Sequence, residues 1–496
     1  MRFLRYLPLL ALPSTLVAQD PAMLARIRDE GLNHSHAYAM LDTIATVFGP
    51  RLTASPAYMR AINWSRDRFA GWGLANPHLE TWPFGRGWEL QKFTFEMTAP
   101  RYFPVLGLPD AWSPSTTGEI TGSPLMIAGI SADALEKMRG RLKGAIVMTA
   151  PMMSTFIRED RINPTAPNAP SDTYTPAPQI GARPAAGAAA GRAGRGGGAN
   201  EAQRIATILH DAGVGVVLKP TRGEHGTLFL QTRNGGPTGV PTVEVGGEDY
   251  NNIIRLLENH VPVTLKVNIQ GKYFTSDTNG YNVIAEIPGT DPRLKDEVVM
   301  LGGHIDSWHA ATGAMDNADG AATILEAARI LKAVGVAPRR TIRFALWGGE
   351  EEGLYGSKAW VAQHLSGDAN KVARDKFDVY FNVDPGYGLV YGWYSEGNTA
   401  AKQLFDAWLE PFKDLGARKN VIAGIGNTDH LSFIAEGVPG FNPIQDFTNY
   451  DVRIHHTNMD TMDRMKPDDI KEAAIVFASF AYNAAMRDAP IPRAPR

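Results

Sequence analysis

The second half of the chain alternates between short apolar runs and helical stretches, and this alternation limits the folds available to it. Five apolar runs follow one another at 282–287, 297–301, 341–346, 377–383 and 438–441. The stretches between and after them carry apolar residues at helical spacing, at 317–334, 355–365, 398–413 and 468–486. Alternating strands and helices favour a mixed, largely parallel sheet that helices cover on both faces. We therefore predict an α/β fold whose active site lies beyond the carboxyl ends of the strands.

The chain is long enough for two or three folding units. We assign residues 19–108 and 272–496 to one catalytic domain in two parts. Residues 109–271 contain short strand and helix patterns without a catalytic cluster, which predicts a smaller inserted β/α domain. Its segment 162–200 is rich in Pro, Ala, Gly and Arg and cannot bury a core, so we predict a mobile loop there.

The N-terminus has the pattern of an export signal. Residues 1–5 carry two arginines, 6–17 are apolar, and Ala18 offers a small residue at a cleavage site. The apolar run is too short to cross a bilayer, and Pro8 and Pro13 argue against a buried helix. We predict a signal peptide at 1–18 that is cleaved, and a secreted or periplasmic protein without a membrane span.

The composition limits which residues can act as metal ligands or nucleophiles. The chain has no cysteine, so thiolate ligands and nucleophiles are excluded, and any metal must be held by His, Asp or Glu. The formal net charge is -3, which gives no reason to expect nucleic acid as a partner.

Residues able to bind metal follow several of the predicted strands. Zinc takes imidazole nitrogen and carboxylate oxygen, and two zinc ions need a bridging carboxylate and further ligands on each. Peptide hydrolysis also needs a general base, which a spare Glu beside a ligand Glu provides. Each residue alone has a plainer explanation, such as a helix cap or a turn, but together they point to a metal site. They are His304, Asp306, Asp316, Glu350, Glu351, Asp384 and the pair His455 and His456.

In their order and spacing these motifs resemble the co-catalytic zinc exopeptidases of the bacterial leucyl aminopeptidase type, with the carboxypeptidase Q branch as the nearest match. The resemblance covers about 35–105 and 272–490, and it implies a zinc exopeptidase fold. The inserted region is similar to a protease-associated domain. The motifs that carry the resemblance are 49–53, 302–308, 313–317, 347–357, 382–384 and 455–462.

The resemblance implies two zinc ions per chain and a role for each site residue. Asp316 bridges both ions, His304 and Asp384 complete one site, and Glu351 and His456 complete the other. Glu350 is the general base, and Asp306 holds a ligand in place. His456 is preferred to His455 because it stands four residues before Asp460, as in the family. Asp429 is a candidate for positioning the substrate, with a helix cap as the alternative.

The implied activity is hydrolysis at the end of short peptides or dipeptides, and a homodimer is plausible in this family. Two other functions stay open: single-zinc acyl transfer of the glutaminyl cyclase type, and a non-catalytic receptor or binding protein. The full set of five ligands speaks against both. The sequence leaves open which end of the peptide is recognised and whether manganese or cobalt replaces zinc.

Overall fold

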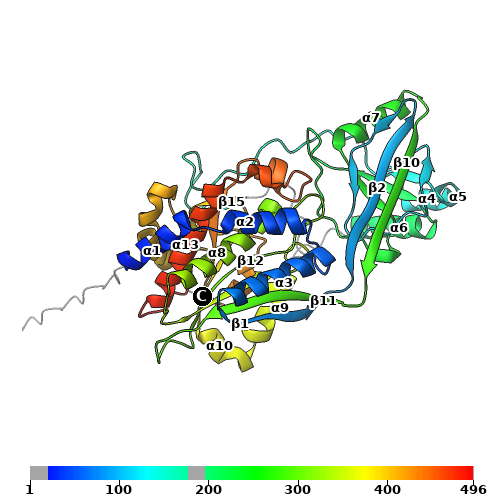
Figure 1. The fold of residues 1–496 in the computed structure, drawn as a ribbon. Helices are drawn as coiled ribbons and strands as arrows, with labels where there is room; N and C mark the ends of the chain where they lie inside the picture. The colour runs from blue at the N-terminus through cyan, green and yellow to red at the C-terminus, as the bar shows by residue number, and fades with distance from the viewer. Residues whose placement is uncertain (1–19, 177–195, 495–496) are drawn as a thin grey trace, which may run out of the picture.

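The computed structural model describes residues 20–176 and 196–494 (Figure 1). The predicted signal peptide lies outside these residues, as does the part of the predicted loop from 177 to 195. The described residues form three sheets, of seven, four and five strands. None of the described helices is long and apolar enough to cross a membrane.

The seven-stranded sheet confirms the predicted mixed, largely parallel sheet. Strands β11 and β15 run opposite to the other five. In spatial order the strands are β1 (Ala75–Pro83), β11 (Asn279–Ile287), β13 (Thr341–Trp347), β12 (Val298–His304), β14 (Phe377–Asn382), β16 (Gly440–Asp446) and β15 (Tyr387–Tyr394).

Alternate residues of each strand point to opposite faces of this sheet. Helices cover both of these faces. Val299 and Phe344 pack into a large core with α1 (Pro21–Asn33), α2 (Ala37–Asp42), α3 (Pro56–Gly71), α8 (Asp319–Ala333), α11 (Thr399–Leu409) and α13 (Pro467–Met486). Met300 and Tyr380 pack on the other face with α9 (Tyr355–His364) and α12 (His430–Ala435). α10 (Lys371–Asp375) precedes β14.

The register of the parallel strands brings the predicted site loops together. His304 at the end of β12 pairs with Trp347 at the end of β13, and Gly302 pairs with Asn382 at the end of β14. The loops that follow these three strands therefore leave the sheet at one edge, which is the edge expected for an active site.

Two long strands lead to a second region, with β2 (Gly87–Ala99) and β10 (Thr264–Phe274) side by side (Figure 1). They join β3 (Phe103–Pro104) and β5 (Ile120–Gly122) in the four-stranded sheet. The domain boundaries at 108 and 272, and the protease-associated character of the insertion, stay predictions. The five-stranded sheet has the order β4 (Gly107–Pro109), β9 (Thr242–Val245), β8 (Val216–Pro220), β7 (Ile146–Met148) and β6 (Leu125–Met126), with helices α4 (Ala132–Lys137), α5 (Arg139–Leu142), α6 (Gly196–Asp211) and α7 (Gly247–Glu258).

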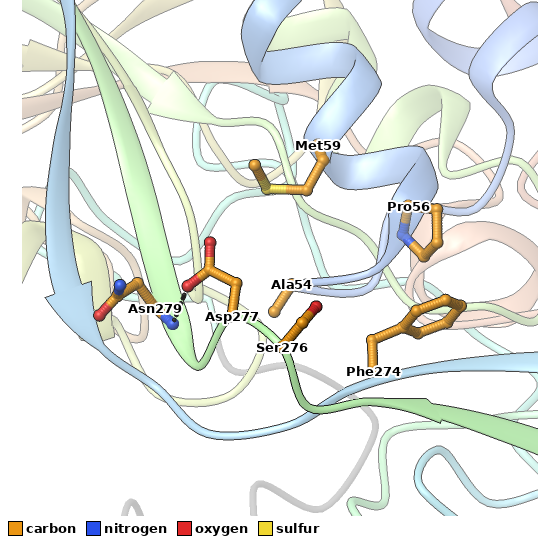
Figure 2. A pocket seen from close by; sticks show the side chains of 7 residues that line it. All are labelled: Ala54, Pro56, Met59, Phe274, Ser276, Asp277 and Asn279. Atoms are coloured by element: carbon orange, nitrogen blue, oxygen red, sulfur yellow. Dashed lines mark hydrogen bonds between the residues drawn. The ribbon is translucent and has the colours of Figure 1, made fainter.

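A pocket of about 180 Å³ lies where the chain passes from β10 to β11, beside the start of α3. Figure 2 shows Asp277 on its wall, accepting a hydrogen bond of 2.9 Å from the backbone N–H of Asn279. The lining contains none of the predicted site residues, so we place the functional site elsewhere. The lining residues are Ala54, Pro56, Met59, Phe274, Ser276, Asp277 and Asn279.

Candidate metal centre

His304 is fully buried at the end of β12, and its two ring nitrogens face different partners. Nδ1 lies 3.1 Å from the backbone oxygen of Asp306 and 3.5 Å from its carboxylate. Nε2 lies 3.5 Å from Asp316, 3.9 Å from Glu350 and 3.9 Å from Asp384. A hydrogen bond from Nδ1 to a carbonyl oxygen leaves the Nε2 lone pair free, so this ring is oriented to bind a metal toward the three acids.

Asp306 connects the loop after β12 with the loop after β13. Its carboxylate accepts hydrogen bonds of 3.3 Å from the backbone N–H groups of Glu350 and Glu351. The Thr53 hydroxyl lies 3.3 Å from the same carboxylate and donates to Glu352 at 2.9 Å. Asp306 therefore fixes the backbone of the two glutamates as well as the ring of His304.

The carboxylate of Asp316 lies between two histidines. Its Oδ1 is 3.5 Å from Nε2 of His304, and its Oδ2 is 3.4 Å from Nε2 of His456. The carboxylate of Asp460 holds this segment by accepting bonds from the backbone N–H of Met315 at 2.7 Å and of Asp316 at 3.1 Å. One carboxylate that faces two separate imidazoles has the arrangement of a bridge between two metals.

The ring of His456 faces two acids, Glu351 and Asp316. Its Nε2 lies 2.8 Å from Oε2 of Glu351 and 3.4 Å from Oδ2 of Asp316. The ring of His455 stacks on Tyr450, with centroids 5.2 Å apart, and its ligand atom also lies within 4.8 Å of those of Asp316 and His456. Both histidines thus lie near Asp316, and of the two described rings only that of His456 lies within ion-pair distance of Glu351.

The donor set fits a metal ion. Within the described chain, Nε2 of His304, Oδ2 of Asp316 and both side-chain oxygens of Glu351 are buried without a hydrogen-bond partner. Leaving buried charged atoms without partners is costly, and a bound cation removes that cost. The ligand atoms of His304, Asp316 and Asp384 also lie within 4.8 Å of one another.

Burial and neighbouring charged groups shift the pKa values of several residues in this site. Burial, and after it the charges of Asp384, Asp429 and Glu351, raise the pKa of Glu350 well above its usual range, although His304 acts against the shift. Burial, and after it the charge of Asp316, also raise the pKa of Glu351 well above its usual range. Burial acts against the charge of His304, but the surrounding carboxylates, Glu350 first, hold its pKa well above the usual value. The site therefore favours bound positive charge.

Asp429 is fully buried just before α12, and its side chain does not cap that helix. The capping alternative is therefore not what the structure shows. Burial raises the pKa of Asp429 to about 7, against the charge of His304, and the carboxylates of Asp306 and Asp384 add to the shift. Asp429 thus lies within electrostatic reach of the site acids, and a role toward substrate stays a proposal.

Arg51 supports the site loops, a role that the sequence alone did not indicate although the residue lies in the motif 49–53. The side chain is fully buried and donates hydrogen bonds of 2.8 Å to the backbone oxygens of Ile305, Thr312 and Gly313. It also donates to Gly49 at 2.8 Å. The guanidinium thereby fixes the loop between His304 and Asp316. The Gly-Pro-Arg motif at 49–51 was the signal available in the sequence.

Known proteins share this arrangement of elements. Residues 282–481 match the sequence profile described as Peptidase family M28. Carboxypeptidase Q from Bos taurus is 27% identical over 468 residues, which covers 93% of this chain and 88% of that protein. The crystal structure of a peptidase M28 precursor from Shewanella amazonensis has a TM-score of 0.69 and 21% identity, covering 96% of this chain and 99% of the other.

The structure of a zinc aminopeptidase from Bacillus subtilis has a TM-score of 0.59 and 19% identity, covering 91% of this chain and 95% of that one. These two structures show the fold that the chain shares with them. The matched region contains each residue predicted to bind metal, from His304 to His456. Residues 282–481 therefore match Peptidase family M28, and the chain is similar to carboxypeptidase Q over most of its length.

Proposed function

We propose that the chain is a metallo-exopeptidase that uses two zinc ions to hydrolyse the terminal bond of short peptides or dipeptides. The observation that carries the proposal is the carboxylate of Asp316, whose two oxygens face His304 and His456. His304 and Asp384 would complete one site, and Glu351 and His456 the other. Bound zinc ions supply Lewis acidity, which polarises a carbonyl and makes water more acidic.

Glu350 is the proposed general base. Its carboxylate lies 3.9 Å from Nε2 of His304, and its backbone N–H is held by Asp306. Burial raises the pKa of Glu350 well above its usual range, and a raised pKa makes a carboxylate a stronger base. Its carboxylate would take a proton from the attacking water and deliver it to the leaving amine.

The N-terminal pattern supports export of the enzyme to the periplasm or beyond the cell. The relatives leave open which end of the peptide is recognised, because one is named a carboxypeptidase and the other an aminopeptidase. Free dipeptides, N-blocked dipeptides and aminoacyl chromogenic substrates separate the two modes. Cleavage of a substrate with a blocked amine would exclude an aminopeptidase.

Metal analysis of the purified protein distinguishes the proposal from the two other functions. A single-zinc acyl transferase would bind one ion per chain, whereas the paired donor sets predict two. A non-catalytic relative would show no hydrolysis with both ions bound.

Replacing Glu350 with Gln tests the mechanism. Glu350→Gln removes the proton acceptor but preserves the size of the side chain, so we expect two zinc ions to remain and kcat to fall about 100-fold or more. Glu258→Gln, at the exposed end of α7, is the matched control and should leave both quantities unchanged. A Glu350→Gln enzyme within about tenfold of wild type would exclude Glu350 as the general base.

A further inference from the structure

The ring of His456 has a hydrogen-bond partner from the middle of the chain. Its Nδ1 lies 3.0 Å from Oε1 of Gln231, a residue 225 positions earlier. Gln231 lies between β8 and β9, in the region predicted to be an insertion. A residue outside the matched M28 segment thus touches a proposed metal ligand inside it.

Backbone contacts fix the position of Gln231 independently of its side chain. Phe229 pairs with Thr457 as an antiparallel bridge, and the N–H of Leu230 donates to the backbone oxygen of His456 at 2.8 Å. The N–H of Leu228 donates to the Asn458 side chain at 2.7 Å, and the N–H of Asn458 donates back to the oxygen of Leu228 at 3.1 Å. Leu228 and Leu230 are buried, which anchors the segment.

The chemistry of the contact selects one form of the imidazole. An amide oxygen only accepts hydrogen bonds, so with Oε1 of Gln231 facing the ring, the neutral imidazole of His456 carries its proton on Nδ1. The lone pair is then on Nε2, the atom that lies 2.8 Å from Glu351 and 3.4 Å from Asp316. This is the form in which a neutral histidine binds a metal.

The two histidines of the centre are held in different ways. Nδ1 of His304 is directed by the backbone oxygen of Asp306, two residues away in the same loop. The corresponding acceptor for His456 comes from a separate part of the chain. Partners of this kind orient a ligand and raise its affinity for metal, typically by 10- to 100-fold.

We propose that Gln231 is a positioning residue of the metal centre, through which the inserted region holds His456 in its metal-binding tautomer and orientation. The inference rests on the proposed function, since it takes His456 as a ligand. It adds that the M28 segment alone does not complete the centre. The insertion is then a structural part of the active site as well as a separate lobe.

Zinc affinity tests the proposal in the full-length protein. Metal-free samples of wild type, Gln231→Leu and Gln231→Glu are titrated with Zn²⁺ against a chelating indicator, and their unfolding midpoints are measured without metal. Gln231→Leu removes the acceptor, so we expect one of the two zinc ions to bind about 10- to 100-fold more weakly and the other to bind as in wild type. Gln231→Glu keeps an acceptor oxygen and should restore tight binding.

Gln203→Leu, on an exposed position of α6 in the same region, is the matched control and should leave both affinities unchanged. Wild-type affinity at both sites in Gln231→Leu would overturn the proposal. So would an equal loss at both sites together with a lower unfolding midpoint, because that result indicates packing alone. Two zinc ions in wild type that both persist unchanged in His456→Ala would instead overturn the proposed ligand set and this inference with it.

Discussion

Asp319, the first residue of α8, has a buried carboxylate whose charge should destabilise the folded chain at neutral pH. Its side chain is 1% exposed. Oδ2 accepts a hydrogen bond of 2.8 Å from the backbone N–H of Gly388, while Oδ1 has no hydrogen-bond partner in the described structure. Burial raises the pKa of this group to about 7, and the charge of Asp469 adds to the shift against the Gly388 bond.

The size and sign of the effect follow from this pKa. The unfolded chain has the ordinary value of 3.8, so the folded chain binds the proton more tightly. Stability therefore falls as pH rises from about 4 to about 7 and is constant above that. Each unit is worth about 1.4 kcal/mol, so about 3 kcal/mol is lost between pH 5 and pH 8.

The variant Asp319→Asn removes the charge and retains an oxygen that accepts from Gly388. We expect its stability relative to wild type to increase by about 3 kcal/mol between pH 5 and pH 8. Urea unfolding of both metal-free proteins at several pH values measures this difference, and other titrating groups cancel because both proteins contain them. Asp368→Asn, on an exposed residue, should show no such trend. A difference between Asp319→Asn and wild type that stays constant or falls with pH would refute the reasoning.

Two further variants test the contacts that hold the site. Arg51→Lys leaves at most three N–H donors for the five carbonyl groups that Arg51 binds. We therefore expect the free energy of unfolding in urea to fall by about 3 kcal/mol and zinc binding to weaken. Wild-type stability in this variant would contradict the role of Arg51 in holding the loops. Arg161→Met leaves Asp451 buried without its ion-pair partner and should cost about 3–5 kcal/mol, while adding Asp451→Asn should recover part of the loss; additive effects in the double variant would show that the pair is not coupled.

Much of the large sheet could be predicted from the sequence because its strands and helices have local signals. The run predicted at 341–346 is β13 (Thr341–Trp347), and the helix predicted at 317–334 is α8 (Asp319–Ala333). β15 (Tyr387–Tyr394) was missed, because it follows Pro385 and Gly386 and its place depends on antiparallel pairing with β16. That pairing joins residues 48 to 59 positions apart, which no local pattern reports.

The approach of the site loops could also be predicted, since parallel strands end at one edge of a sheet. The contacts from other parts of the chain could not. Which residue of the predicted insertion reaches His456 depends on how the two regions pack together, and this packing includes contacts such as the buried pair of Arg161 and Asp451. The sequence shows Gln231 as an ordinary polar residue between strands, and only the folded chain places its oxygen against the ring.

Four acids of the centre divide into two pairs by what their oxygens contact. Asp306 and Asp460 each accept two backbone N–H bonds, and these bonds fix the loops that contain Glu351 and Asp316. Glu351 and Asp316 keep buried oxygens that no N–H reaches. A carboxylate stabilised by amide donors gains less from a cation than one without partners, because its charge is already compensated. Asp306 and Asp460 therefore shape the site, whereas Glu351 and Asp316 keep oxygens whose charge a bound cation would compensate.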